Sequence, residues 1–419
     1  TAGAPGGVRP ADGDHLEELG GDGAVKEIEL GAICEFINGG AWSDKEYASS
    51  GIPVLKVSNF KPNDFLIDDI NYLPLSDAKK YAKNKLLLND VIIATVGSHP
   101  NIQNSAAGRS CVVNSLVEGF YLNQNAVCIR TTDSEILDQR YLGYLAKSRE
   151  FQHYIQSRGR GAANQMRIAI SSIKEYKFYL PKIEIQRRIA DILSTYDDLI
   201  ENNRKQIKLL EEAAQRLYKE WFVNLRFPSY EHAKIVDGVP EGWEEDCLSK
   251  IAEFKRGKTI TKAQIEPGTV PVVAGGLEPA YYHNVANTKA PVITVSGSGA
   301  NAGFTRMYHT DVFASDCSFI DKSTCAFLPF VYCFLTHHKA KLDSLKKGSA
   351  QPHVYAKDIN ALHICVPNED FLHRFCDFAE LLFSKIGLLE KQNKDLTQVR
   401  DRLLPKLMSG EIEVYPTKR

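Results

Sequence analysis

The sequence has no stretch typical of a membrane or secreted protein and no spacing typical of a metal site. No run of eighteen or more apolar residues occurs in its 419 positions, so no transmembrane helix is expected. The nine cysteines are scattered and include no C-x-x-C pair, which favours free thiols in a reducing cytoplasm over disulfides or zinc. The adjacent His337 and His338 lack metal-ligand spacing, so no metal site is expected.

The motifs of a DNA-modifying enzyme are absent as well. An amino-methyltransferase would carry N-P-P-[FY] or D-P-P-Y, and the nearest stretch, at residues 328–330, lacks the amide and the second proline. No G-x-x-x-x-G-K-[ST] loop occurs, so ATP hydrolysis by this chain is not expected. The Gly-Ser-Gly stretch at 297–299 lacks the lysine and an immediate helix, and it is interpreted as a strand-end turn. The sequence therefore predicts no catalytic site.

Two long heptad patterns organise the rest of the chain, which has the apolar content (43%) and charge (25%) of a folded protein with two or three domains. The first pattern runs from Ile183 to about Phe222, and the second lies 186 positions later. Each becomes polar near its middle, at Asn203 and Gln206 in the first and at Lys385 and Gln392 in the second. Two similar helices, each following a globular stretch, indicate a tandem repeat.

The globular stretches repeat too, which supports this interpretation. At a spacing of 218, Phe36 matches Phe254, Gly39 matches Gly257 and Pro53 matches Pro271. DVIIATVGS at 90–98 then matches PVITVSGSG at 291–299, and each is a β-branched strand ending in a Gly/Ser turn. The spacing falls to 186 by Pro181 and Pro367, so the first globular stretch contains insertions.

The predicted fold is α+β, with two tandem globular domains separated by two long helices that form an antiparallel coiled coil. A long helix with a narrow apolar seam is not stable alone, and a two-fold relation between the repeats makes the pair antiparallel. The polar positions Asn203, Gln206, Lys385 and Gln392 would then meet near the middle and fix the register. An ordinary hairpin of core helices is the alternative.

The domain boundaries follow from these patterns. Asn368 is expected to cap the second helix, and Pro405 to kink or end it. The predicted segments are a disordered leader or cloning remnant (1–24), a first globular domain (25–181), a central spacer helix (182–226), a linker (227–245), a second globular domain (246–367), a C-terminal spacer helix (368–407) and a tail (408–419).

A second apolar stripe on the first helix widens its apolar face. It is formed by residues seven positions apart, namely Ile200, Ile207, Ala214 and Trp221. We interpret this stripe as a docking surface for helices of a partner protein, with burial under the chain's own loops as the alternative.

Local basic clusters are concealed by a net charge of −1. Residues 140–181 carry eight basic and two acidic residues, and further clusters lie at 255–262 and 339–347. Separated basic patches can bind nucleic acid because phosphate contacts are local. Solvated loops are the alternative for any single cluster.

Polar and basic side chains gather in equivalent loops of both repeats, where they could read bases and hold phosphates. The candidate DNA-binding residues of the first repeat are His99, Asn101, Gln103, Asn104, Arg109, Arg158, Arg160, Asn164, Gln165 and Arg167. Those of the second repeat are Lys255, Arg256, Lys258, Ser298, Asn301, Arg306, Lys346, Lys347, Gln351 and His353.

From about Val25 to Val414, the order of these segments resembles the specificity subunit of type I restriction-modification systems. The residues that carry the resemblance are the helical segment from Pro181 to Phe222 with its trailing W-F, the F-P and V-P-E-G-W elements of the linker, and LLPKLMSGEI near the end. The resemblance implies that each globular domain is a target recognition domain that reads one half of a split, asymmetric DNA sequence. It also implies that the helices are a spacer and a platform for two methyltransferase subunits.

The resemblance further implies a non-catalytic, cytoplasmic subunit of a host-defence complex that binds double-stranded DNA and no membrane. Methylation with S-adenosylmethionine, and cleavage with ATP and Mg²⁺, would reside in methyltransferase and restriction/translocase partners, so no cofactor is expected in this chain. Two alternatives stay open: a specificity subunit of a related enzyme that fuses restriction and methylation, and a helical adaptor that does not read DNA. A stand-alone nuclease or methyltransferase is not expected.

Overall fold

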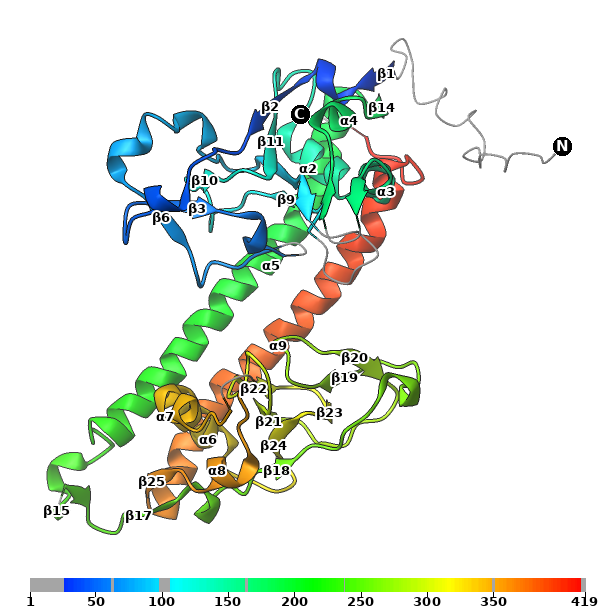
Figure 1. The fold of residues 1–419 in the computed structure, drawn as a ribbon. Coiled ribbons are helices and arrows are strands. Elements are labelled where there is room, and N and C mark those ends of the chain that lie inside the picture. Colours follow the sequence, from blue (N-terminus) through cyan, green and yellow to red (C-terminus); the bar gives the residue numbers. More distant parts are fainter. Residues whose placement is uncertain are drawn as a thin grey trace. The chain divides into compact units, whose positions relative to one another are not determined.

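The chain divides into two units in the computed structural model, which describes residues 26–61, 64–97, 106–162, 165–236, 238–348 and 351–415 (Figure 1). The first unit comprises residues 1–198 and 396–419, and the second comprises residues 199–395. The predicted leader, residues 1–24, lies outside the described residues. Each unit therefore contains one globular domain and one end of each long helix.

The long helices are α5 (Ile183–Tyr218), which continues into a π-helical turn at Lys219–Val223, and α9 (Glu369–Met408). The Asn368 side chain accepts a hydrogen bond from the Phe371 N–H at 3.1 Å, which confirms the predicted cap. Pro405 does not end α9, because the helix continues for three more residues. A proline this close to the C-terminal end of a long helix disturbs only its last turns.

The two helices run antiparallel, as predicted (Figure 1). Within the second unit, the Asn203 amide donates hydrogen bonds to Gln392 at 3.2 Å and to Asn393 at 2.9 Å. Farther along α5, the ring of Trp221 packs against Phe375, 5.9 Å between centroids. Residues nearer the C-terminus of α5 thus contact residues nearer the N-terminus of α9, as antiparallel helices must. Asn203 is buried and Gln392 bonds to it, so two of the four predicted polar residues form a register contact, whereas Lys385 is exposed.

In the first unit, strands β1 to β11 precede the first short α-helix, in keeping with the predicted α+β class. The strands are β1 (Lys26–Glu29), β2 (Cys34–Asn38), β3 (Ile52–Leu55), β4 (Phe60–Lys61), β5 (Asp64–Phe65), β6 (Asn71–Leu73), β7 (Val91–Ala94), β8 (Val96–Gly97), β9 (Ser110–Val112), β10 (Tyr121–Leu122), β11 (Ala126–Thr131), β12 (Arg160–Ala162), β13 (Gln165–Arg167) and β14 (Lys177–Leu180). The short α-helices are α2 (Gln139–Lys147), α3 (Arg149–Ser157) and α4 (Ile170–Lys174).

The second unit repeats this plan with fewer strands. Its strands are β15 (Ile235–Val236), β16 (Val239–Pro240), β17 (Glu244–Cys247), β18 (Lys255–Arg256), β19 (Val270–Val273), β20 (Tyr281–His283), β21 (Val292–Ser296), β22 (Thr305–Tyr308), β23 (Phe313–Ala314), β24 (Cys317–Asp321) and β25 (His363–Val366). Its short α-helices are α6 (Leu328–His337), α7 (Lys339–Ser344) and α8 (Ala356–Asn360).

The sheets of the two units have matching topologies. The four-stranded antiparallel sheet has the order β2-β11-β7-β9 in the first unit and β18-β24-β21-β22 in the second. Beside it, β3 pairs with β10 in parallel, and β19 pairs with β23 in parallel. Strand β1 pairs with β14, just as β17 pairs with β25. The strand matches predicted from the sequence therefore lie at equivalent places in two copies of one fold.

Two glycines at equivalent positions, just after the first strand of each four-stranded sheet, allow a close approach of two backbone segments. A Cβ atom on Gly39 would lie 1.9 Å from the Asn123 carbonyl oxygen, and one on Gly257 would lie 2.3 Å from the Ser315 carbonyl oxygen. Both distances are far below van der Waals contact, so any side chain there would separate the two backbones.

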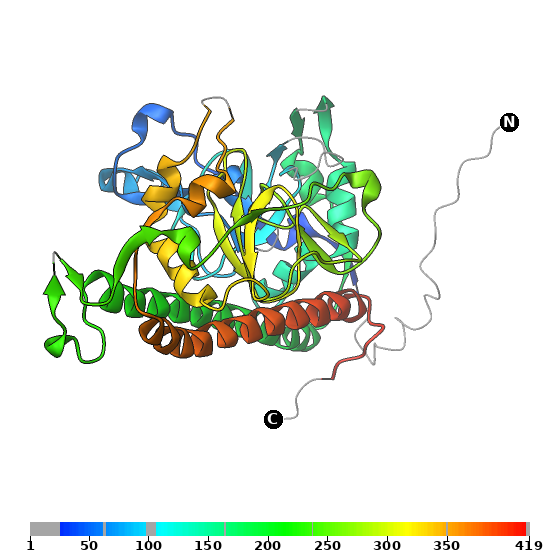
Figure 2. The same ribbon diagram turned by 90° about the horizontal axis from the view of Figure 1, so that it is seen from below.

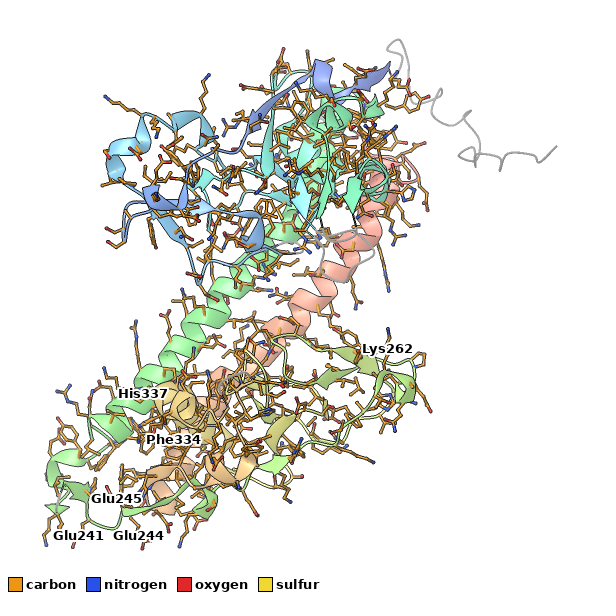
Figure 3. All side chains as sticks on the ribbon, viewed as in Figure 1. Glu241, Glu244, Glu245, Lys262, Phe334 and His337 are labelled. Atoms are coloured by element: carbon orange, nitrogen blue, oxygen red, sulfur yellow. The ribbon has the colours of Figure 1, made fainter. Side chains whose placement is uncertain are left out.

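The predicted linker is not a loose connection. Strands β15 and β16 form a hairpin, and the flanking Phe227 and Trp243 rings pack 5.1 Å apart in the core of the second unit. The side chains of the linker's glutamates point outward beside this hairpin, where Figure 3 labels Glu241, Glu244 and Glu245.

Short helices cover one flank of each long helix. In the second unit, α6 packs on α5, with the Tyr218 and Phe330 rings 5.6 Å apart and Ala214 buried beneath (Figure 2). In the first unit, the Tyr144 hydroxyl of α2 donates to Asp197 of α5 at 2.8 Å. Each long helix is therefore buried on a flank against its own domain as well as against the other long helix.

Three expected absences can be compared with the described residues. All nine cysteines are free thiols, as predicted, and burial raises the pKa of most of them, to about 12 for Cys34 and Cys317. No helix in the described part of the chain is long and apolar enough to cross a membrane. The described ranges contain no cluster of three or more potential metal ligands.

A buried ion pair joins the helices in the first unit and gives a test of the packing. Arg400, 8% exposed, bonds to Asp197 and, at 2.8 Å, to Asp401. Arg400→Met should lower the free energy of unfolding by about 3 kcal/mol, because Asp197 would lose its charge partner. Urea denaturation would measure this change. Arg402→Met, at an exposed position of the same helix, is the control and should change stability by less than about 0.5 kcal/mol. Equal effects of the two substitutions would show that the Arg400 ion pair does not stabilise the helix packing.

Candidate nucleic-acid interface

A small three-stranded ribbon in the first unit contains several of the candidate residues. Strand β13 lies between β12 and β8, with Arg167 opposite Arg160 on one side and opposite Val96 on the other. Both arginines are exposed. Arg158, just before the ribbon, places its guanidinium 4.8 Å from the centre of the Tyr154 ring. The basic residues predicted from the sequence thus share one hairpin.

The second unit has an equivalent ribbon, made of single bridges instead of strands. His353 pairs with Lys347 on one side and with Ser298 on the other. The loops predicted to be equivalent, at 159–167 and 347–353, therefore occupy the same position in the two copies. The Gly-Ser-Gly stretch forms the predicted turn after β21, with Gly299 at a φ of 79°.

A concavity of about 220 Å³ lies beside this second ribbon. Its lining includes four candidate residues, Arg256, Ser298, Gln351 and His353. The His353 ring stacks on Tyr355, and the Ser298 hydroxyl donates a hydrogen bond to Asp316. The pocket thus combines one cation, one carboxylate and several neutral hydrogen-bonding groups, which are the side-chain types that read base edges.

Sequence analysis missed two contributors to this concavity, Asp316 and Tyr355. Asp316 immediately precedes β24, whose pairing places Cys317 opposite Ser296 at the end of β21. The sequence match at 291–299 could have identified Asp316 only if β24 had been recognised as the strand that pairs with β21. Tyr355 lies two residues beyond His353, on the same side of an extended segment.

The remaining candidates of the first unit have different surroundings. The Arg109 guanidinium donates to the Phe60 carbonyl oxygen at 2.6 Å, so the chain itself holds this side chain. Gln165 lies in β13. The other candidates lie outside the described residues, namely His99, Asn101, Gln103, Asn104 and Asn164.

The remaining candidates of the second unit fall into three places. Lys255 and Lys258 are exposed at or just beyond β18, the edge strand of the four-stranded sheet. Lys346 and Lys347 pair with carboxylates of their own unit. The Asn301 amide donates to the Gly275 carbonyl oxygen at 3.4 Å, which holds the turn after β21.

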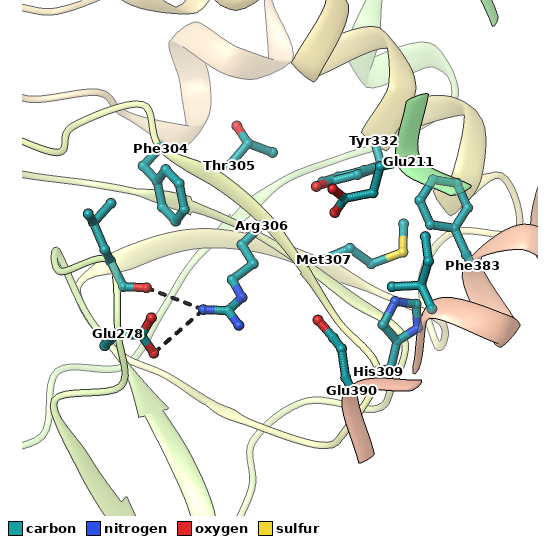
Figure 4. Close-up of a pocket in the computed structure, with 12 residues that line it drawn as sticks. Glu211, Glu278, Phe304, Thr305, Arg306, Met307, His309, Tyr332, Phe383 and Glu390 are labelled. Atoms are coloured by element: carbon teal, nitrogen blue, oxygen red, sulfur yellow. Dashed lines mark hydrogen bonds and ion pairs between the residues drawn. The ribbon is translucent and has the colours of Figure 1, made fainter. Parts of the chain in front are cut away.

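Arg306 points away from these groups and into a separate pocket of about 440 Å³ (Figure 4). Its guanidinium lies 3.8 Å from the Glu278 carboxylate and donates to the Leu277 carbonyl oxygen at 3.3 Å. Glu211 of α5 and Glu390 of α9 also line this pocket. That Arg306 contacts DNA stays a prediction, and in this structure its guanidinium is held by Glu278 and Leu277 of its own unit.

Burial dominates the electrostatics of this pocket. Desolvation raises the pKa of the Glu390 carboxyl, and the nearby Arg306 opposes that rise only in part. Burial also raises the pKa of the Glu211 carboxyl, and Arg306 again opposes the rise. Burial also lowers the pKa of His309 to about 4, so this imidazole is neutral at pH 7. The pocket carries an excess of negative charge and is not suited to bind a phosphate.

Comparison with known proteins connects this duplicated fold with a family. The model of the type I restriction modification DNA specificity domain matches residues 23–212 and again residues 240–398. The chain belongs to this family. The two matches correspond to the two globular domains, each with the helical segment that follows it.

Several specificity subunits are similar to this specificity-domain protein. The type I restriction enzyme MjaIX specificity subunit from Methanocaldococcus jannaschii is 28% identical over 307 residues, which cover 65% of this chain and 69% of that one. The putative MjaX specificity subunit from the same organism is 22% identical, with 96% of each chain covered. The crystal structure of a type I S subunit from M. genitalium has a TM-score of 0.55 at 19% identity and covers 91% of this chain and 95% of that one, which shows a shared fold.

The predicted docking stripe of this specificity-domain protein is buried. Ala214 is fully buried, and Ile200 and Trp221 are each 6% exposed. Ile207 packs against the core of the second unit. These four residues therefore form no exposed face, in line with the alternative of burial within the chain: α6 covers Ala214, and α9 contacts Trp221.

Part of the predicted seam is exposed instead. On α9, Phe378 is 58% exposed although it lies in the heptad seam, whereas Phe375 and Leu389 of the same seam are buried. Leu381 and Leu388 of α9 are 71% and 58% exposed, and Leu209 of α5 is 62% exposed. The second unit thus leaves an apolar stripe on its long helices that sequence analysis did not identify. We call these residues (Leu209, Phe378, Leu381 and Leu388) the exposed stripe.

The raised pKa of Glu390 predicts a pH-dependent stability. A carboxyl whose pKa is higher in the folded than in the unfolded chain destabilises the fold above its folded pKa, and this effect disappears as the pH falls below the unfolded value. Glu390→Gln should therefore raise stability at pH 7 by on the order of 0.5 kcal/mol, a small value because solvent screens the site. Urea denaturation between pH 7 and pH 4 should show the difference vanish. Glu380→Gln, an exposed control on the same helix, should show no such trend.

Proposed function

We propose that this chain is the DNA specificity subunit of a type I restriction-modification complex and that each unit reads one part of a split, asymmetric target. The observation that carries the proposal is the occurrence of the same sheet and ribbon in both units with different side chains at equivalent positions. Arg160 and Arg167 of one ribbon correspond to Lys347 and His353 of the other. Equivalent positions with unlike side chains favour two unlike half-sites, in contrast to the palindrome that identical units would read.

The concavity of the second unit suits direct reading of base edges. Arg256 can donate to guanine, Gln351 can pair with adenine, and the Asp316 carboxylate can accept from the amino group of cytosine. The glycine turn at 297–299 lets the backbone approach the duplex closely. We assign reading of the second half-site to this group of side chains.

The exposed stripe is the proposed docking site for a methyltransferase subunit. Leu381 and Leu388 lie seven residues apart, and Phe378 lies three before Leu381, so the three share one side of α9. Figure 2 shows that the strands and short helices of the second unit lie on one side of its long helices, which leaves a helical face for a partner. Helical partners with an apolar face fit such a stripe.

Catalysis is assigned to the partner subunits in this proposal. A complex with two methyltransferase subunits would use S-adenosylmethionine, and restriction/translocase subunits would use ATP and Mg²⁺. The residues of this chain supply binding, orientation and sequence choice. The concavity fits this role, because it offers hydrogen-bonding groups that can read base edges.

A methylation map of cellular DNA tests the proposal. Cells that lack other adenine methylation would express this chain with its methyltransferase partner, and sequencing would locate the methylated adenines. We expect a bipartite, non-palindromic motif. Exchange of residues 199–395 for the equivalent segment of another specificity subunit should change one part of the motif and preserve the other. A continuous or palindromic motif would contradict the proposal, and no methylation with a competent partner would favour a helical adaptor that does not read DNA.

Substitutions in the exposed stripe test the docking site. The double variant Leu381→Ser, Leu388→Ser should lose co-elution with the methyltransferase subunit in size-exclusion chromatography, because two large apolar contacts disappear. The midpoint of urea denaturation should stay unchanged, since both side chains are exposed in the chain alone. The matched control is Leu75→Ser, Leu87→Ser, which removes two exposed leucines (74% and 47%) from the recognition domain of the first unit. Normal co-elution of the helix variant would contradict this site.

A further inference from the structure

The ribbon of the first unit holds two like charges in an unfavourable position. Arg160 and Arg167 are directly opposite one another on adjacent antiparallel strands, so their Cβ atoms lie about 5 Å apart. Like charges at such a position destabilise the strand pair. Within the described ranges, neither guanidinium forms an ion pair with a carboxylate of this chain, and both side chains are exposed. An anion placed between them would relieve the repulsion.

A third arginine is oriented at the base of the same ribbon. The Arg158 guanidinium lies over the Tyr154 ring at 4.8 Å, and the Tyr154 hydroxyl donates to the Ser172 carbonyl oxygen at 3.0 Å. The ring is thus held at both its face and its hydroxyl. Stacking on a fixed ring restricts the guanidinium while its outer N–H groups stay available for an acceptor.

The equivalent ribbon of the second unit has its basic charges compensated by its own carboxylates. The Lys347 ammonium donates to both Asp358 oxygens at 2.9 Å, and Lys346 lies 2.7 Å from Asp343. Lys347 occupies the position that corresponds to Arg160, because each residue is the outer partner of the central segment. The two copies of the ribbon therefore differ in net charge although they share one backbone plan.

We infer that the two units have different roles on DNA: the Arg160–Arg167 pair clamps a backbone phosphate, whereas the second ribbon adds little to the phosphate contacts. This inference rests on the proposed function. Two guanidinium groups side by side can each donate to the oxygens of one phosphodiester, an arrangement stronger than a single ion pair. The first ribbon then supplies more of the electrostatic affinity than the second, whose unit adds the groups of its concavity and the exposed Lys255 and Lys258.

The salt dependence of DNA affinity distinguishes the contributions of the two ribbons in one experiment. Fluorescence anisotropy would measure the affinity of the complex of this chain with its methyltransferase partner for a labelled duplex carrying the mapped target and for a scrambled duplex, between 50 and 200 mM KCl. Each lost phosphate contact reduces the slope of log affinity against log salt by about 0.9. Arg160→Gln, Arg167→Gln should reduce the slope by about one such step, because one phosphate contact is lost, and should weaken binding to both duplexes alike.

Two further variants make the result decisive. Lys346→Gln, Lys347→Gln removes the same charge from the equivalent ribbon and should leave the slope unchanged. Arg160→Lys, Arg167→Lys keeps the charge and should restore the slope, which a merely misfolded ribbon would not do.

Three outcomes have distinct meanings. An unchanged slope for the Arg160→Gln, Arg167→Gln variant, or an equal reduction for both glutamine pairs, would overturn the inference. A wild-type complex whose weak binding shows no salt dependence would refute DNA binding itself, and with it the proposed function.

Discussion

Each long helix of this protein must bury two flanks at once, and the rest of the structure depends on this constraint. One flank of α5 contacts α9, and the next contacts a short helix of the adjacent domain, as Tyr218 does with Phe330. The domain and the helix pair therefore share one core, in which Trp221 touches α9 while Ala214 lies beneath α6. Because both packings use the same helix, the orientation of each recognition domain on its own helices is fixed by side-chain packing and not by a flexible connection. The buried linker residues Phe227 and Trp243 strengthen this attachment.

The long periodic features could be predicted from the sequence because many residues specify them. A heptad pattern over about five repeats predicts a helix whatever its neighbours are, and the two copies of the pattern predicted the antiparallel pair. Matches such as Gly39 with Gly257 identified the duplicated fold, since close backbone approach demands glycine at both places. The polar pair Asn203 and Gln392 was also identifiable, because polar residues in a heptad seam need partners across it.

The direction in which individual side chains point could not be predicted, because it depends on packing between distant segments. Ala214 and Trp221 formed an apolar stripe in the sequence, but only the positions of α6 and α9 show that the protein itself covers it. The stretch at 328–330 was the nearest match to an amino-methyltransferase motif, and in the structure it forms the start of α6. Arg306 follows a loop rich in polar residues, yet it lies in β22 and its guanidinium is held by Glu278 and Leu277. The contact that covers Ala214, from Cys333, joins residues 119 positions apart.

The connectivity of the units has a genetic consequence. The second unit is one continuous segment, residues 199–395, whereas the first is completed by a segment from the other end of the chain. A single replacement within the gene, with both junctions inside helices, would therefore exchange a whole recognition domain. Such an exchange would preserve the fold only if the incoming segment kept the helical phase at both junctions, since a shift of one residue rotates a helix by about 100°. New DNA specificities could then arise by recombination between related genes, with the exchanged segment bringing its own parts of both long helices.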